Sequence, residues 1–338
     1  MWSVHSVGSV FTRPATISDS TILEFVTDRW SVDAERAEYA PVGFGSHHWL
    51  LGTAHGWKRF VTVDDLVAKR RSPLEPLEGT FDRLQAALTT ARGLADAGHD
   101  FVLAPDRSRH GDIIQRLDER FTVACFEWVD GVVGDYGQYH SETTRETVAG
   151  HLVALHDVGL GSVPHCRFED FEVSNRDEFD AAWTRMDEVW DTGPHAETAR
   201  ELLRVNVDTV AERFETYDDL VVSALAVRDQ WVVTHGEPHG SNVLTTGHGT
   251  RLIDWDTALI APRERDVWHL DSDDGLAAAI YSAAGGPQAA AELLDMYRLQ
   301  WDLMEITGYI TLFCDAHEDT KDSLESLRNL RHYIAPRL

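Results

Sequence analysis

The sequence predicts an α+β protein of two lobes, with a small mixed sheet in front and a mainly helical part behind it. Short strand-like segments separated by glycine turns fill the first third, while helical periodicities fill most of the remainder. A length of 338 residues with 43% apolar residues suffices for about two domains with a sizeable core. We expect an N-terminal lobe of residues 1–127 and a C-terminal lobe of residues 128–338.

The N-terminal lobe is expected to begin with a helix and to continue as a sheet. A Ser-Asp-Ser capping cluster precedes the helix, which covers residues 22–30. A second helix covers residues 80–97, where apolar side chains recur every three or four positions. The expected strands cover residues 39–42, 48–51, 59–63, 101–103, 112–117 and 121–126.

The C-terminal lobe is expected to be helical except for one strand-rich interruption at residues 231–253. The predicted helices cover residues 143–158, 177–190, 196–217 and 293–313, with further helix from residue 277 onward. Ligands often bind where two lobes meet. A binding site is therefore expected near the join at residues 127–131.

The charge of the chain is strongly negative, with 57 acidic and 30 basic residues and a formal net charge of -27. This balance argues against partners that are nucleic acids or anionic membrane surfaces. It suits a cationic small-molecule substrate, although the same acidity would also serve solubility alone or reflect a salt-adapted host.

The cysteines and the hydropathy pattern predict a cytoplasmic protein. Cys125, Cys166 and Cys314 are far apart and form no CxxC pair, which argues against a disulfide framework or a zinc site. The N-terminal residues lack the basic start and long apolar core of a signal peptide. No apolar run approaches the roughly 20 residues that span a bilayer.

The residues that point most clearly to chemistry follow an apolar strand at residues 231–234. A polar loop, HGEPHGSN, covers residues 235–242, and a short hairpin leads to Asp254-Trp255-Asp256. Phosphoryl transfer needs an acceptor for the proton of the attacking hydroxyl and oxygen ligands for magnesium. Glu237 can accept the proton, and Asn242 and Asp254 can supply the oxygens. Each residue alone also fits an ordinary polar loop, but the combination favours a kinase-type site.

This arrangement, H-G-E-x4-N followed by a hairpin and D-W-D, resembles the catalytic signature of the aminoglycoside phosphotransferase family, small-molecule kinases related to protein kinases. The run at residues 261–266, APRERD, resembles that of spectinomycin phosphotransferases in particular. The family reads H-G-D-x4-N, so Glu237 lengthens the catalytic side chain by one methylene. The resemblance implies a protein-kinase-like fold in which His235 braces the loop and Asn242 and Asp254 bind Mg²⁺.

The nucleotide side is predicted around a turn between two strands. Gly43 and Gly45 would let backbone amides there and at Ser46 approach phosphates, although two glycines in a hairpin also make an ordinary turn. By resemblance this is a glycine-rich loop that binds ATP or GTP. The backbone groups of Glu127 and Val129 would then bind the base at the hinge, in the run CFEWVDG at residues 125–131.

In related kinases a lysine on the next strand holds the phosphates. Strand alternation predicts that Thr62 takes this position, where it brings no charge. Three other cations could hold the phosphates: Lys58, Arg59 and Lys69.

The resemblance places the acceptor between the catalytic loop and the helical lobe, with Asp256, Glu264 and Trp268 as candidate contacts. Carboxylates pair with amines, and indole rings stack on cations. We therefore expect a cationic or polyhydroxylated acceptor, and the family resemblance implies an aminoglycoside or aminocyclitol antibiotic. A kinase of a primary metabolite and a kinase-fold binding protein with weak or no catalysis are the alternatives.

Overall fold

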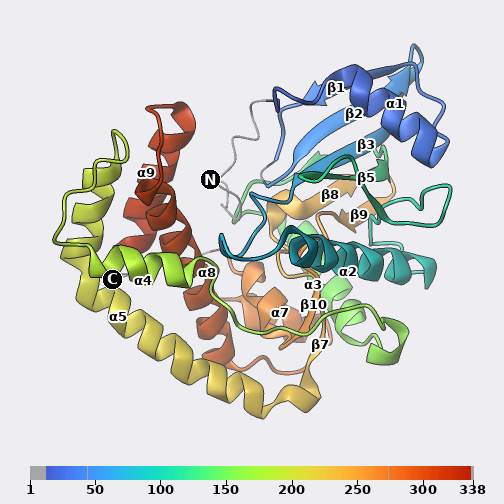
Figure 1. The fold of residues 1–338 in the computed structure, drawn as a ribbon. Helices are drawn as coiled ribbons and strands as arrows, with labels where there is room; N and C mark the ends of the chain where they lie inside the picture. The colour runs from blue at the N-terminus through green and yellow to red at the C-terminus, as the bar shows by residue number, and fades with distance from the viewer. Residues whose placement is uncertain (1–12, 44, 273, 336–338) are drawn as a thin grey trace.

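The computed structural model describes residues 13–43, 45–272 and 274–335. It has the two lobes that the sequence predicts: a sheet with one covering helix forms the first, and helices form most of the second (Figure 1). The expectation of no signal peptide concerns an N-terminal segment of which residues 1–12 lie outside the described part. Within the described part, no helix is both long and apolar enough to cross a membrane.

The first lobe is built on a five-stranded sheet in the order β1-β2-β3-β5-β4, with antiparallel pairing throughout. Its strands are β1 (Arg36–Ala40), β2 (His47–Thr53), β3 (Gly56–Asp65), β4 (Ile114–Arg116) and β5 (Phe121–Glu127). Val61 and its cross-strand neighbours Trp49 and Cys125 are buried against helix α1 (Asp19–Trp30). Because side chains alternate between the two faces, Thr62 and its partner Ala124 lie on the opposite face.

Helix α2 (Leu77–Asp96) connects the cores of the two lobes. Its buried residues Leu84, Leu88 and Leu94 belong to one apolar cluster with Ala124 of β5 and Leu152 of the second lobe. Burial of apolar surface stabilises this contact by about 25 cal/mol per Å². The helix therefore packs against both the sheet and the helical lobe.

The second lobe consists mainly of helices. They are α3 (Glu142–His156), α4 (Arg176–Thr184), α5 (Ala196–Ala226), α6 (Glu264–Val267), α7 (Ala277–Ala283), α8 (Ala291–Cys314) and α9 (Lys321–Ile334). Helix α8 packs against α5 and α9 and buries most of its side chains. Figure 1 shows α5 along the outer edge of this lobe.

Two small sheets hold the segments that carry the motif. Strand β7 (Val232–Thr234) pairs with β10 (Leu259–Ala261), and β8 (Val243–Thr246) pairs with β9 (Gly249–Leu252) and with β6 (Val132–Val133). The loop at residues 235–242 connects β7 to β8, and the segment at residues 253–258 connects β9 to β10. Because both of their ends belong to paired strands, the two segments must run beside each other.

Three elements differ from the sequence-based prediction. Residues 101–103 form no strand; a single bridge between Val102 and Leu252 takes its place. The helix expected at residues 177–190 already ends at Thr184, whereas the one expected at residues 196–217 continues to Ala226. Apolar periodicity locates a helix better than it locates the end of one.

Candidate active site

The buried carboxylate of Asp266 anchors the loop at residues 235–242 by hydrogen bonds. This carboxylate accepts the backbone N–H groups of His235 (2.9 Å) and Gly236 (2.6 Å), and it lies 3.0 Å from Nε2 of His156. Burial alone would raise the pKa of Asp266, but the hydrogen bond and the charge of His156 outweigh it and lower the pKa. The ionised carboxylate therefore fixes the shape of the loop. No role for Asp266 was apparent from the sequence.

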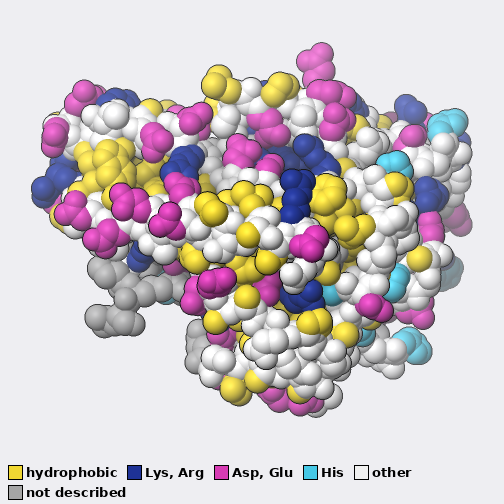
Figure 2. Space-filling view, turned by 90° about the horizontal axis from the view of Figure 1, so that it is seen from below, with side chains coloured by type: hydrophobic (Ala, Val, Ile, Leu, Met, Phe, Trp, Pro, Cys, Tyr) yellow, Lys and Arg dark blue, Asp and Glu magenta, His cyan; other side chains and the backbone are white. Residues whose placement is uncertain are grey.

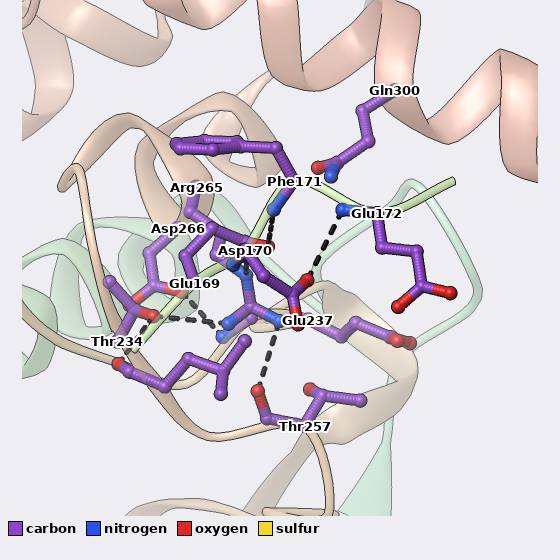
Figure 3. A network of polar contacts seen from close by, with 12 residues as sticks. Glu169, Asp170, Phe171, Glu172, Thr234, Glu237, Thr257, Arg265, Asp266 and Gln300 are labelled. Atoms are coloured by element: carbon purple, nitrogen blue, oxygen red, sulfur yellow. Dashed lines mark hydrogen bonds and ion pairs between the residues drawn. The ribbon is translucent and has the colours of Figure 1, made fainter. Parts of the chain in front are cut away.

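Arg265 forms hydrogen bonds and an ion pair with the segments that surround the loop (Figure 3). Its guanidinium donates to the hydroxyl of Thr234 (3.0 Å) and the carbonyl of Thr257 (2.9 Å), and it pairs with Glu169 (3.2 Å). Gly236 has a φ of +103°, and a Cβ atom there would collide with this guanidinium. Both facts require glycine at this position.

The ring of His235 bonds both to the loop and to the segment that follows β9. Its Nε2–H donates to the carbonyl of Ile253 (2.9 Å), and its Nδ1 accepts the N–H of Glu237 (3.2 Å). The ring also meets Trp255 edge to face at 4.5 Å. Burial lowers the pKa of His235. Both ring nitrogens are occupied within the protein, so His235 is a positioning residue in this geometry.

Glu237 extends from the loop into a cleft of about 710 Å³ between the lobes. Its side chain is 17% exposed, and Oε2 lies 3.6 Å from Nε2 of His239. Glu172 also lines the cleft, and Figure 3 shows both carboxylates extending to the same side of the network. Trp301 of α8 and Lys69 line the same cleft. Glu237 is thus a carboxylate at the surface of a ligand-sized space.

Asn242 and Asp254 lie on the two neighbouring segments. The Asn242 Nδ2 donates to the carbonyl of Glu237 (3.0 Å), which turns Oδ1 to the other side, and the N–H of Ile253 donates to the Asn242 carbonyl (3.0 Å). This second bond brings Asp254, the next residue, close to Asn242. Asp254 has a φ of +65°, an uncommon conformation for a residue other than glycine.

The electrostatics of Asp254 suit a residue that meets a cation. Desolvation raises the pKa of its carboxyl well above the usual range, the neighbouring Asp256 raises it further, and Lys69 opposes the shift. Asn242 and Asp254 offer hard oxygen atoms, which Mg²⁺ prefers. Within residues 13–43, 45–272 and 274–335, no three His, Cys, Asp or Glu side chains form a metal-binding cluster. Asn242 and Asp254 are the two side chains here that would hold such an ion.

Lys69 places a positive charge at the surface of the cleft. Thr62 lies on the face of β3 opposite helix α1, and Asp64 follows on the same face. The ammonium of Lys69 returns from the segment after β3 to within 3.3 Å of Asp64 and 2.6 Å of Asp256. Arg83 of α2 donates to the Lys69 carbonyl (2.8 Å) and thereby fixes that segment. Of the three cations considered from the sequence, Lys69 reaches the site.

The glycine turn adopts conformations that favour glycine. Gly43 and Gly45 have φ values of +74° and +82°. His48 Nδ1–H donates to the carbonyl of Val42 (2.6 Å), which holds the turn against β2. The Ser46 hydroxyl donates to Asp64 (2.6 Å). Its hydroxyl is therefore engaged within the lobe, and its backbone amide is the group left to meet a phosphate.

The hinge candidates follow the edge of β5. The Trp128 N–H donates to the carbonyl of Lys58 (3.1 Å), whereas the Cys125 carbonyl accepts the N–H of Asp106 on the other side. Strand backbone groups alternate in direction. Glu127, the last residue of β5, therefore directs its backbone groups away from β3, and Val129 lies beyond the end of the strand.

The three residues predicted to contact the acceptor lie in different environments. Asp256 and Trp268 line the cleft. Glu264 is 5% exposed, and its carboxylate accepts the N–H of Ala290 (2.8 Å). This carboxylate fixes the approach to α8, so the expected contact between Glu264 and the acceptor is not supported.

Similarity to known proteins identifies the family of the chain. Residues 39–306 match the model of the phosphotransferase enzyme family that includes the aminoglycoside phosphotransferases. The chain belongs to this family. Protein StrN of Streptomyces griseus is 29% identical over 251 residues, which cover 71% of this chain and 74% of that protein.

Solved structures show the same fold. Spectinomycin phosphotransferase APH(9)-Ia, in complex with ADP and spectinomycin, superposes with a TM-score of 0.74 at 16% identity, over 95% of this chain and 96% of that one. Choline kinase LicA from Streptococcus pneumoniae gives a TM-score of 0.53 at 12% identity, over 93% and 98%. The chain is thus a phosphotransferase with the fold of small-molecule kinases, and this family covers both antibiotics and metabolites as substrates.

Proposed function

We propose that this phosphotransferase moves the terminal phosphoryl group of ATP or GTP to a hydroxyl of a small polyhydroxylated molecule of the aminocyclitol or aminoglycoside type. The observation that supports this most strongly is the joint position of Glu237, Asn242 and Asp254. They lie on two adjacent segments that hydrogen bonds hold together, and Glu237 and Asp256 of these segments line a ligand-sized cleft.

In this proposal Glu237 acts on the acceptor. Its carboxylate orients the hydroxyl and takes its proton as the hydroxyl oxygen bonds to the terminal phosphorus. The bond between that phosphorus and the bridging oxygen breaks, and the nucleoside diphosphate leaves. His235 and Asp266 keep the loop in place during this step. Mg²⁺, when held by Asn242 and Asp254, would neutralise charge on the phosphates.

The nucleotide is proposed to bind under the first lobe. Backbone amides at Gly43 and Gly45 approach the phosphates, and the Lys69 ammonium, beside Asp256, supplies the positive charge. The backbone groups of Glu127 and Val129 are proposed to bind the base. Thr62 would then lie near the phosphates but contribute no positive charge.

On the acceptor side, the support comes from Asp256 and Trp268 at the cleft surface. A carboxylate and an indole face suit a ring with hydroxyl and amino groups. We also propose a cytoplasmic location, where the nucleotide donors are found. The thiols of Cys125, Cys166 and Cys314 are free, in keeping with a reducing compartment.

A two-step experiment tests the function. Thermal unfolding is measured with and without MgATP and MgGTP, because a nucleotide at 100 times its Kd stabilises the folded state by about 2.7 kcal/mol. Formation of ADP or GDP is then followed with a panel of aminocyclitols, aminoglycosides and amino alcohols. Stabilisation together with acceptor-dependent turnover supports the proposal. Stabilisation without turnover would favour a binding protein, and no stabilisation by either nucleotide would reject the nucleotide site.

A further inference from the structure

Lys69 belongs to a linker that contacts both lobes. This linker, residues 66–76, connects β3 to α2. The Lys69 ammonium lies 3.3 Å from Asp64 of the first lobe and 2.6 Å from Asp256 of the second. Residues of a strand are fixed by the hydrogen bonds to the neighbouring strands, whereas connecting segments move more easily. The position of this ammonium therefore depends on the contacts that hold the linker.

Arg71, two residues after Lys69, attaches the linker to the second lobe. Its Nη1 lies 2.6 Å from Oδ2 of Asp170 and 3.1 Å from Oε2 of Glu172, and its carbonyl accepts the N–H of Asn175 (2.6 Å). Burial alone would lower the pKa of Arg71, but the charge of Asp170 and the hydrogen bonds to both carboxylates raise the pKa. The Arg71 side chain is 23% exposed, so salt screens these ion pairs less than it screens pairs at an open surface.

The segment of the second lobe that carries these partners, residues 169–175, is itself anchored. The hydroxyl of the buried Tyr217 on α5 donates to the carbonyl of Phe171 (2.8 Å). The hydroxyl of the buried Thr307 on α8 donates to the carbonyl of Ser174 (2.7 Å). Because two helices hold its backbone, this segment offers Arg71 a fixed point of attachment.

Two further side chains connect the backbone of Arg71 to that of Lys69. Arg83 of α2 donates to the Lys69 carbonyl (2.8 Å) and to Oε2 of Glu75 (3.1 Å). The same Glu75 oxygen accepts the N–H of Arg71 (2.6 Å). The backbone on both sides of the linker thus belongs to one hydrogen-bonded unit, and a change in the attachment of Arg71 is transmitted to Lys69.

We propose that Arg71 is a positioning residue for nucleotide binding: its ion pairs with Asp170 and Glu172 hold the linker so that the Lys69 ammonium meets the phosphates. This inference rests on the proposed function, because it requires that Lys69 contacts the nucleotide. It adds that the affinity for the nucleotide depends on an ion-pair contact between the linker and the second lobe.

A double-mutant cycle tests whether Arg71 acts through Lys69. Isothermal titration calorimetry with MgATP compares the wild type, Arg71→Gln, Lys69→Met and the double variant. Arg71→Gln should raise the Kd by about 3–10-fold, as expected for a residue that acts through another group. Lys69→Met removes the ammonium, so adding Arg71→Gln to it should change the Kd less than about twofold. An unchanged Kd in Arg71→Gln, or effects that multiply in the double variant, would overturn the inference.

A matched control separates positioning from a general loss of stability. Lys and Arg side chains lie among Asp and Glu side chains elsewhere on the molecule, as Figure 2 shows for one face. Arg298 of α8 is 28% exposed and also has two carboxylate partners, Asp271 at 2.7 Å and Asp295 at 3.1 Å, both within the second lobe. Arg298→Gln should lower the melting temperature about as much as Arg71→Gln does and leave the Kd of MgATP within about twofold. Equal rises of the Kd in both variants would contradict the positioning role.

A variant in the second lobe tests the same contact from the other side. Asp170→Asn removes the nearer partner of Arg71, and the fold should tolerate it because the Asp170 side chain is 49% exposed. It should raise the Kd of MgATP by about 2–5-fold, and this rise should disappear in the Lys69→Met background. This result decides the question even if Arg71→Gln does not fold.

The outcomes distinguish this inference from the proposed function. If the wild type binds MgATP and Lys69→Met weakens binding, but Arg71→Gln and Asp170→Asn leave the Kd unchanged, the inference fails while the proposed function stands. If the wild type binds neither MgATP nor MgGTP, the proposed function fails and the inference fails with it.

Discussion

Replacement of Lys69 by methionine should weaken both the fold and the nucleotide site. Methionine keeps the length and packing of the side chain but removes the ammonium that lies 2.6 Å from Asp256 and 3.3 Å from Asp64. The side chain of Lys69 is only 14% exposed. Breaking a buried ion pair by removing one partner costs about 3–5 kcal/mol, which corresponds to a melting temperature lower by roughly 5–10 °C.

The same substitution should raise the Kd for MgATP by about 10–100-fold, since a hydrogen bond from a charged donor contributes about 1.5–3 kcal/mol. Differential scanning fluorimetry and isothermal titration calorimetry measure the two effects. Lys58→Met, at an exposed position of β3, is the matched control and should change neither. Thr62→Lys in the Lys69→Met background should restore part of the affinity, because Thr62 lies on the same face of β3 as Asp64, which Lys69 contacts. Unchanged MgATP affinity in Lys69→Met would refute the assignment.

Three further outcomes follow from the site. Asp266→Asn, which replaces an acceptor of two loop N–H groups by an amide, should lower kcat at least tenfold and leave the Kd of MgATP within threefold; an unchanged kcat would remove Asp266 from its positioning role. Burial lowers the pKa of His48 from 6.5 to about 4, so the unfolded chain binds a proton between these values and the folded chain does not. Stability should therefore fall by up to about 3 kcal/mol as the pH drops from 6.5 to 4, and acid titration of His48→Gln should show a shallower decline. Glu264→Gln should change acceptor KM less than twofold, and a large rise would return Glu264 to the acceptor site.

The sequence predicted the parts of the site that depend on short-range order. Glu237 and Asn242 are five positions apart in one loop, and the hairpin between Asn242 and Asp254 is short enough to bring the two segments together. Strand alternation places Thr62 on the face of β3 opposite helix α1, and the structure has it there. These arguments need only the local geometry of strands, turns and loops.

The remaining features depend on the path of the chain through space. Lys69 follows β3 by a few residues, and only the tertiary fold returns its ammonium to the cleft. Asp266 and Glu264 occur in one short helix, yet one holds the catalytic loop and the other binds the N–H of Ala290. Spacing alone cannot assign these opposite directions. Residues 101–103 likewise had the composition of a strand but found a single bridging partner.

The central claim is that Glu237 takes the proton of an acceptor hydroxyl beside a nucleotide held by the two adjacent segments. Single-turnover transfer of radiolabelled phosphate from ATP to an accepted ring tests it most directly, with wild type, Glu237→Gln and Glu237→Asp compared at saturating MgATP. The account predicts a rate about 10²–10⁴-fold lower for Glu237→Gln, substantial transfer by Glu237→Asp, and equal MgATP binding in all three. Transfer by Glu237→Gln at the rate of the wild type would contradict it.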